Sequence, residues 1–275
     1  MLYICKAYFI NTNLGFMAFD FIVNTPRKEY KNTFLQNVFL SIHFDKIDQA
    51  SVSCNFNENW EKYIRTTFNN LEPRSNFFSE PISISREDRV CTIVLSNGLI
   101  GALIGAKDYR SFVDNVLPQL YKLKTFLKDV LDSPKISSIS VRKVNIWQFN
   151  SKDKGQIDLD ALKKSIFSSQ FLNKKVNGQL DDNEKKISNM HKYEWKDVDN
   201  NILAIARTVF MPRRQDGTFA QVLDTEAIYM HNDIILENLE EKSILLNNIL
   251  YELYHWCINS KILKIMEDNN TNSNG

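Results

Sequence analysis

The segment Glu194-Trp195-Lys196 places an acidic residue and a lysine two positions apart. If this segment is a strand, both side chains lie on one face, because side chains alternate along an extended backbone. Metal-dependent nucleases use such a pair: the carboxylate holds a divalent cation, and the lysine stabilises the charge that develops in phosphoryl transfer. The cation needs a further acidic ligand, for which the candidates are Asp182, Asp224 and Glu226.

Short charge patterns of this kind arise often by chance, and a solvated sheet face accounts for the same residues without any chemistry. That second interpretation is favoured. We therefore predict no catalytic residue, and a metal-dependent nuclease or phosphodiesterase built on Glu194 and Lys196 is kept as an alternative.

Residues that could hold a metal or a cofactor are scattered along the chain. The four histidines are solitary, and the four cysteines include no C-x-x-C pair, so neither a local zinc site nor a redox motif is indicated. The 8 glycines form none of the glycine motifs that cradle nucleotide phosphates. No serine or cysteine has the local sequence of an activated nucleophile. The sequence predicts neither a metal nor a cofactor.

Four residues are candidates for binding. Arg142 and Asn145 lie on one predicted strand, and a guanidinium with a carboxamide can bind an anion or a backbone edge. The favoured alternative for this pair is a buried role in satisfying backbone groups. Arg213 and Arg214 adjoin a predicted turn, where they are solvated or could touch phosphate from the tip of a hairpin.

The composition is that of an ordinary globular protein without a strong electric field. Lysine and arginine number 34 and aspartate and glutamate 33, for a net charge of +1, which does not favour nucleic acid or anionic lipid as a partner. No run of about 18 apolar residues predicts a transmembrane helix, and the dispersed cysteines fit a reducing compartment. We expect a cytoplasmic protein.

Hydrophobic periodicity predicts an alternation of strands and helices. Period-two patterns and turn dipeptides such as Asn97-Gly98 predict strands, over residues 37–44, 82–84, 90–96, 99–104, 136–149, 189–198, 202–211 and 218–230. Apolar residues three and four apart predict helices, over residues 59–68, 111–131, from 158 onward and from 239 onward. A parity change within the strand 136–149 suggests a β-bulge near Arg142.

This order of elements predicts the α+β class, with antiparallel meanders that are each covered by helices. Both halves follow the order strand, helix, three strands, helix, which suggests a structural duplication without visible residue similarity. The predicted divisions are an N-terminal extension 1–28, halves 29–135 and 136–266 that form one unit, and a disordered tail 267–275.

Three places resemble a sporadically distributed, functionally uncharacterised bacterial family of similar length. They are the opening Tyr30 to Phe44, the segment Tyr109 to Lys143 and the helix around Leu246 to Ile262. The family's strand is similar to R-[LI]-G-L-R-[YF]-[IV]-N, and the stretch Ser138 to Asn145 matches it at Arg142 and Asn145 while departing from it at Ser138, Ser140 and Lys143. The resemblance implies no activity, and the family's patchy distribution implies a link with mobile-element or defence genes.

Aromatic residues are numerous, with 18 phenylalanines, 10 tyrosines and 4 tryptophans, and those that a core leaves exposed favour contact with protein. We therefore expect a non-catalytic protein-binding or regulatory module that uses a sheet surface. A nucleic-acid-binding protein without catalysis is a further alternative, and the oligomeric state is left open by the sequence.

Overall fold

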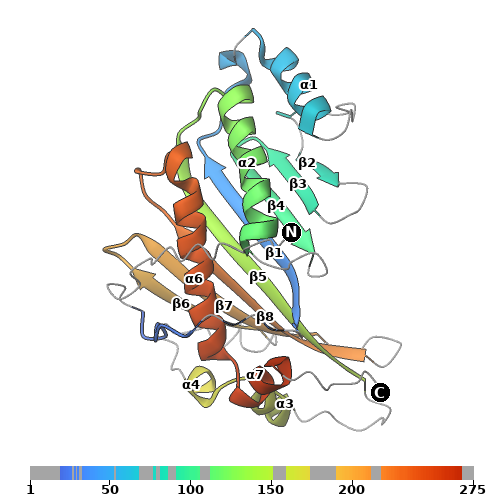
Figure 1. Cartoon of the computed structure of the whole chain (residues 1–275), viewed down its shortest axis with the longest axis vertical. Coiled ribbons are helices and arrows are strands. Elements are labelled where there is room, and N and C mark those ends of the chain that lie inside the picture. Colours follow the sequence, from blue (N-terminus) through green and yellow to red (C-terminus); the bar gives the residue numbers. More distant parts are fainter. Residues whose placement is uncertain are drawn as a thin grey trace, which may run out of the picture.

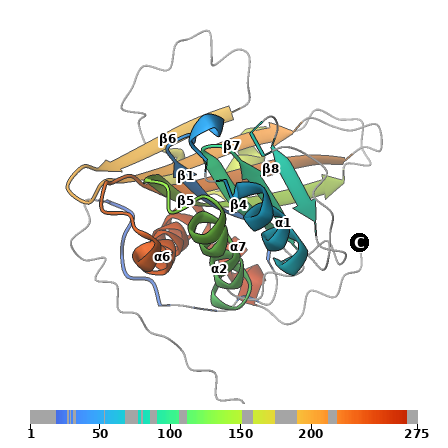
Figure 2. The same ribbon diagram turned by 90° about the horizontal axis from the view of Figure 1, so that it is seen from above.

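Eight strands form one antiparallel sheet, with all the long helices on one side of it (Figures 1 and 2). The computed structural model describes residues 19–26, 28, 30, 33–52, 54–67, 77–78, 81–85, 91–105, 112–150, 159–173, 190–211 and 218–267. This antiparallel sheet packed against helices confirms the predicted α+β class.

The strands follow the alternating patterns of the sequence closely. Their bounds are β1 Leu35–Phe44, β2 Ile82–Ser85, β3 Cys91–Ser96, β4 Leu99–Gly105, β5 Ile136–Asn150, β6 Met190–Asp197, β7 Ile202–Met211 and β8 Thr218–Tyr229. Their order across the sheet is β2-β3-β4-β1-β5-β8-β7-β6, so β1 and β5 lie at the centre and each is followed outward by one meander.

The helices bury the apolar stripes that the sequence predicts. They are α1 Phe56–Thr67, α2 Leu117–Thr125, α3 Leu159–Ile166, α4 Ser169–Leu172, α6 Leu239–Cys257 and α7 Ser260–Glu267, with short 3-10 turns at Gln49–Ser51 and Leu236–Asn238. Helix α2 packs on β4, and α6 packs on β5, β7 and β8. The core lies between these helices and the sheet.

Helix α2 continues at both ends into π-helical segments, Phe112–Val116 and Phe126–Val130. Pro118 stands at its N-terminal end. Proline lacks the N–H that an α-helix needs and its ring crowds the preceding turn, so the wider turn before it is a physical response to this residue. The long helix predicted over 111–131 is confirmed for the described residues 112–130.

The turn between β3 and β4 is the predicted Asn97-Gly98 hairpin. Gly98 adopts φ +94°, a conformation that side chains disfavour. The carboxamide of Asn97 accepts a hydrogen bond from the backbone of Ile47 at 2.8 Å and donates one to its carbonyl at 2.7 Å. This turn therefore also anchors the loop that leads to α1.

Strand β5 has no bulge at Arg142 itself, although a register shift in its pairing with β1 lies close by, between Leu35↔Asn145 and Asn37↔Val144. Strand β5 pairs with β8 without a shift of register from Ile139 to Asn150. The apolar parity changes because Val144 and Ile146 lie on the side of the sheet away from the helices, where they are partly exposed. The register shifts beside β5 fall at the two ends of its pairing with β1.

The structure has one continuous sheet in place of separate meanders. The element order of the two halves agrees with the prediction, while their duplication stays a prediction. The described helices include none that is long and apolar enough to cross a membrane.

An N-terminal arm, residues 19–30 in their described part, closes the helical side. Phe21 packs edge-on against Trp195 at 5.3 Å between ring centroids. The buried carboxylate of Glu252 on α6 accepts hydrogen bonds from the backbone of Val23 at 3.3 Å and from the backbone and hydroxyl of Thr25 at 2.8 and 2.9 Å. The arm thus joins the start of the described chain to its last long helix.

Candidate functional site

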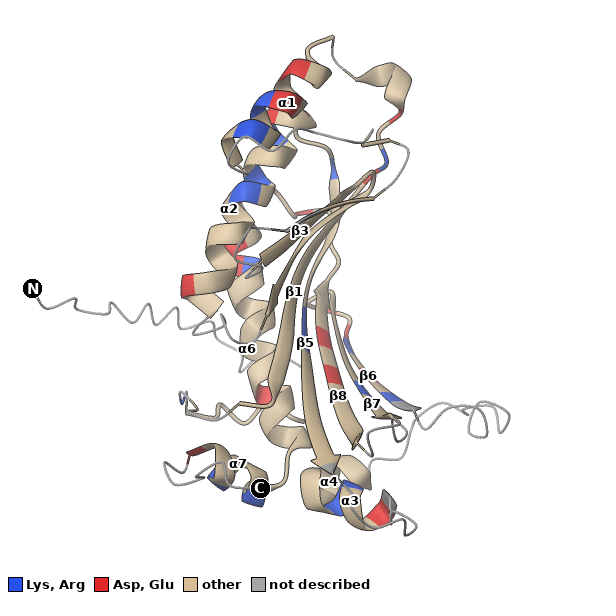
Figure 3. Cartoon of the chain, turned by 90° about the vertical axis from the view of Figure 1, so that its right-hand side faces the viewer, with Lys and Arg blue, Asp and Glu red and all other residues tan. Residues whose placement is uncertain are grey.

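The side of the sheet away from the helices, called the open face below, carries no described helix (Figures 2 and 3). Every second residue of each strand lies on this face. The residues between them along each strand, such as Leu40 and Val141, point toward the helices and are fully buried. The open face is therefore the largest described surface on which several strands present side chains together.

In the half formed by β1 to β4, the described residues of the open face carry no charge, and apolar side chains alternate with polar ones such as Ser41, His43 and Thr92. The partly exposed apolar side chains include Phe39, Val94, Leu99 and Leu103. Gly101 lies among them, and a Cβ built there would stand 2.8 Å from the backbone oxygen of Leu40. The glycine thus permits β4 and β1 to approach closely at this point.

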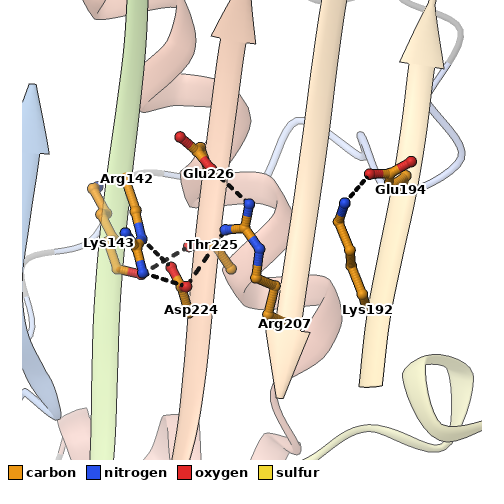
Figure 4. Close-up of polar contacts among 8 residues, drawn as sticks. All are labelled: Arg142, Lys143, Lys192, Glu194, Arg207, Asp224, Thr225 and Glu226. Carbon is orange, nitrogen blue, oxygen red and sulfur yellow. Dashed lines mark hydrogen bonds and ion pairs between the residues drawn. The ribbon is translucent and has the colours of Figure 1, made fainter. Parts of the chain in front are cut away.

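In the half formed by β5 to β8, ion pairs lie at the centre of the open face (Figure 4). Arg142 of β5 binds Asp224 of β8 through two hydrogen bonds, Nε to Oδ1 at 2.7 Å and Nη2 to Oδ2 at 2.8 Å. This two-pronged geometry fixes both groups. Hydrogen bonding to Asp224 raises the pKa of Arg142.

Arg207 of β7 extends this pair into a network. Its Nη2 donates to Oε2 of Glu226 at 2.8 Å, and its Nη1 lies 3.4 Å from Oδ2 of Asp224. The side chain of Asp224 is 9% exposed, whereas that of Arg142 is 42% exposed. Two positive and two negative groups thus form a neutral cluster, called the Arg142–Asp224–Arg207–Glu226 network. Its two carboxylates are the more buried groups, and Arg142 is the most exposed of the four.

Residues of β1 flank the network. The guanidinium carbon of Arg142 lies 5.5 Å from the ring centroid of Phe39, at a distance typical of a cation–π contact. Partial burial lowers the pKa of His43 below its ordinary value, and the negative charge of Glu226 offsets part of this effect. The network therefore links the charged half of the face to the uncharged half.

Glu194 and Lys196 lie on the open face of β6, at the edge of the sheet. Glu194 forms an ion pair with Lys192 on the same strand (Figure 4). In the register, Ile205 of β7 stands between Glu194 and Glu226, so the backbones at these two glutamates are about 10 Å apart, twice the strand spacing. The structure does not bring Glu194 together with the acids of β8.

Asp224 and Glu226 do converge, but on a guanidinium. Arg207 lies at the point where their carboxylates meet, and a cation there would have to displace it. No group of three histidine, cysteine, aspartate or glutamate side chains in the described ranges is arranged to hold a metal ion.

The structure separates the predicted pair Arg142 and Asn145. Positions three apart on a regular strand point to opposite faces, so Asn145 lies on the helical side, 4% exposed. Asp182, Arg213 and Arg214 lie outside the described residues. Of the candidates, Arg142, Asp224 and Glu226 come together, although the sequence argument assigned them to different sites.

Sequence reasoning missed Arg207 and Lys192. Arg207 had a usable signal, since it is the sole charged residue of β7, Ile202–Met211. A charge that interrupts an apolar strand needs a partner when it is partly buried. Its partners Asp224 and Glu226 lie on β8, which pairs with β7 in the predicted meander. Nothing in the sequence, however, specified the pairing of β5 with β8 that brings Arg142 to Asp224.

No protein-family model matches the chain. No curated protein matches it either.

Proposed function

We propose that this protein is a non-catalytic protein-binding or regulatory module that recognises a protein partner through its open face. The observation that carries the proposal is the asymmetry of the sheet. Its helical side is closed by α2, α6 and the N-terminal arm, whereas the other side presents side chains from many strands and bears no described helix.

The chemistry of the open face suits a protein surface. Apolar side chains such as Leu103 and Phe39 supply area that gains free energy when it leaves water, about 25 cal/mol per Å². The ion-pair network supplies polarity that is already ordered, so its side chains lose little entropy on binding. Such fixed charges contribute specificity more than affinity.

The neutrality of the network distinguishes this proposal from the binding of nucleic acid. A phosphate-binding surface uses arginines whose donors are available to the phosphate. Here Asp224 engages two nitrogens of Arg142, and Glu226 engages Arg207. These contacts support a protein partner over a polyanion.

Affinity capture from the native host tests the proposal. The tagged full chain is compared with Leu103→Lys on the open face and with Tyr121→Lys as a matched control, because Tyr121 is 54% exposed on the helical side. We expect a partner that Leu103→Lys loses and Tyr121→Lys retains, as measured by quantitative mass spectrometry. Circular dichroism verifies that both variants are folded.

A partner captured equally by the wild type and Leu103→Lys, or lost only with Tyr121→Lys, would place the binding surface elsewhere and contradict the proposal. A wild-type bait that enriches no protein over an untagged control would also contradict it.

The repeated module and the resemblance to the bacterial family belong to the same proposal. Each central strand, β1 or β5, is followed by a helix, a three-stranded meander and a long helix, and the strand orders β2-β3-β4-β1 and β6-β7-β8-β5 correspond. This correspondence supports duplication of one module. A role in mobile-element or defence systems rests on the resemblance alone, and the genes neighbouring relatives of this chain would test it.

A further inference from the structure

Strand β6 forms one edge of the described sheet and has a strand neighbour on one side only, β7. An edge strand presents backbone N–H and C=O groups that can pair with another strand. The opposite edge, β2, has 4 residues, whereas β6 has 8. Of the two edges, β6 offers the longer template.

The open face of β6 carries charges of alternating sign. Lys192, Glu194 and Lys196 occupy successive positions on this face, and all three are exposed. The side chains of Lys192 and Glu194 are 45% and 40% exposed although they are paired with each other. These charges select among the ways in which a second strand can align.

Symmetry limits those alignments to a few. In a closed dimer, two antiparallel copies of one strand are related by a twofold axis perpendicular to the sheet, and the axis passes through a residue position. An axis at Glu194 sets Glu194 opposite itself and Lys192 opposite Lys196, so every facing pair of charges on the open face repels. An axis at Tyr193 sets Lys192 opposite Glu194 of the second copy, twice.

An axis at Trp195 also gives opposite charges, Glu194 facing Lys196 of the second copy. It pairs only residues 193–197, whereas the axis at Tyr193 pairs residues 190–196 of the strand Met190–Asp197. The alignment at Tyr193 therefore has both the complementary charges and the longer ladder of backbone hydrogen bonds.

From this complementarity we infer that β6 pairs with β6 of a second copy of the chain, antiparallel and with the twofold axis at Tyr193. The two sheets become one continuous sheet. Because the axis is perpendicular to the sheet, the helices of both copies lie on one side and both open faces lie on the other. This inference stands independently of the proposed partner.

Sedimentation velocity on the full chain, up to about 100 μM, tests the dimer. We expect a dimer for the wild type. Lys192→Glu and Glu194→Lys should each raise its dissociation constant by roughly tenfold or more, because two symmetry-related attractive pairs become repulsive. An equimolar mixture of these two variants should regain the dimer, since each facing pair then joins an acidic side chain of one variant to a lysine of the other.

Lys196→Glu is the matched control. In the proposed alignment Lys196 faces residue 190 and its reversal has little effect, whereas with the axis at Trp195 the same change would break the dimer. A monomeric wild type overturns the inference. So does a dimer that survives both single reversals, or a mixture that stays monomeric, while circular dichroism confirms folding in each case.

Discussion

The two halves of the open face present the same architecture to solvent with different chemistry. In β1 to β4 the described residues of this face include no lysine, arginine, aspartate or glutamate, and Gly101 lets two strands approach closely. In β5 to β8, four charged groups form the Arg142–Asp224–Arg207–Glu226 network. The packing of strands in the first half therefore depends on the close approach at Gly101, and the order of side chains in the second half depends on paired charges.

This difference shows two ways in which a sheet remains stable without a helical cover. Small and partly apolar side chains leave little to desolvate, and they suit a partner that excludes water. In the charged half Ile205 is only 3% exposed although this face has no described helix, and it stands in register between Glu194 and Glu226. Substitutions in the two halves should therefore lower the stability of the fold for different physical reasons.

The largest effect is expected in the charged half. Asp224→Ala leaves Arg142 and Arg207 without the carboxylate that both contact. Breaking a partly buried pair costs less than the 3–5 kcal/mol of a fully buried one, because Arg142 remains in contact with solvent. We expect a loss of about 2–3 kcal/mol in the free energy of unfolding, measured by urea denaturation.

Glu194→Ala is the control for this prediction. Its ion pair with Lys192 is exposed, so its removal should cost less than about 0.5 kcal/mol. Equal losses for the two variants would show that burial of the network contributes nothing.

In the uncharged half, Gly101→Ala should destabilise through crowding. The added Cβ would lie 2.8 Å from the backbone oxygen of Leu40, and β1 or β4 would have to shift. Overpacking of this kind costs about 1–2 kcal/mol. Val94→Ala, a truncation on the same face opposite Gly101, should cost less in the same denaturation assay, and the reverse order would contradict the close approach.

Phe39→Ala acts where the halves meet. It removes the ring beneath Arg142 but leaves the two hydrogen bonds to Asp224 intact. A partly exposed cation–π contact contributes about 0.5–1 kcal/mol. Phe39→Leu, which keeps most of the apolar area, should recover part of the loss; complete recovery would assign the effect to area alone.

The smallest effect is on pH dependence. Because the folded pKa of His43 is lowered from its ordinary 6.5, the unfolded chain binds the proton more readily. The contribution of His43 to stability is therefore present above pH 6.5 and is lost as the pH falls toward the folded pKa. Glu226→Gln should lower the pKa of His43 further, as measured by NMR titration; an increase would contradict the electrostatic coupling of β1 to β8.

Local patterns predicted most of the elements, because alternation in β1, β3 and β7 and the turn at Asn97-Gly98 depend on nearby residues alone. The site depends on distant pairing. Arg142 and Asp224 are 82 positions apart, and no local pattern specifies that β5 lies beside β8. The apolar residues Val144 and Ile146 also misled, since their parity indicates burial and they lie on the open face.

The carboxylate of Glu252 receives the N-terminal arm across 227 positions of sequence. Because the ribosome synthesises the chain from the N-terminus, the arm can form these hydrogen bonds only after almost the whole described chain has been synthesised. Truncation of α6 before Glu252 would remove the acceptor of the hydrogen bonds from Val23 and Thr25.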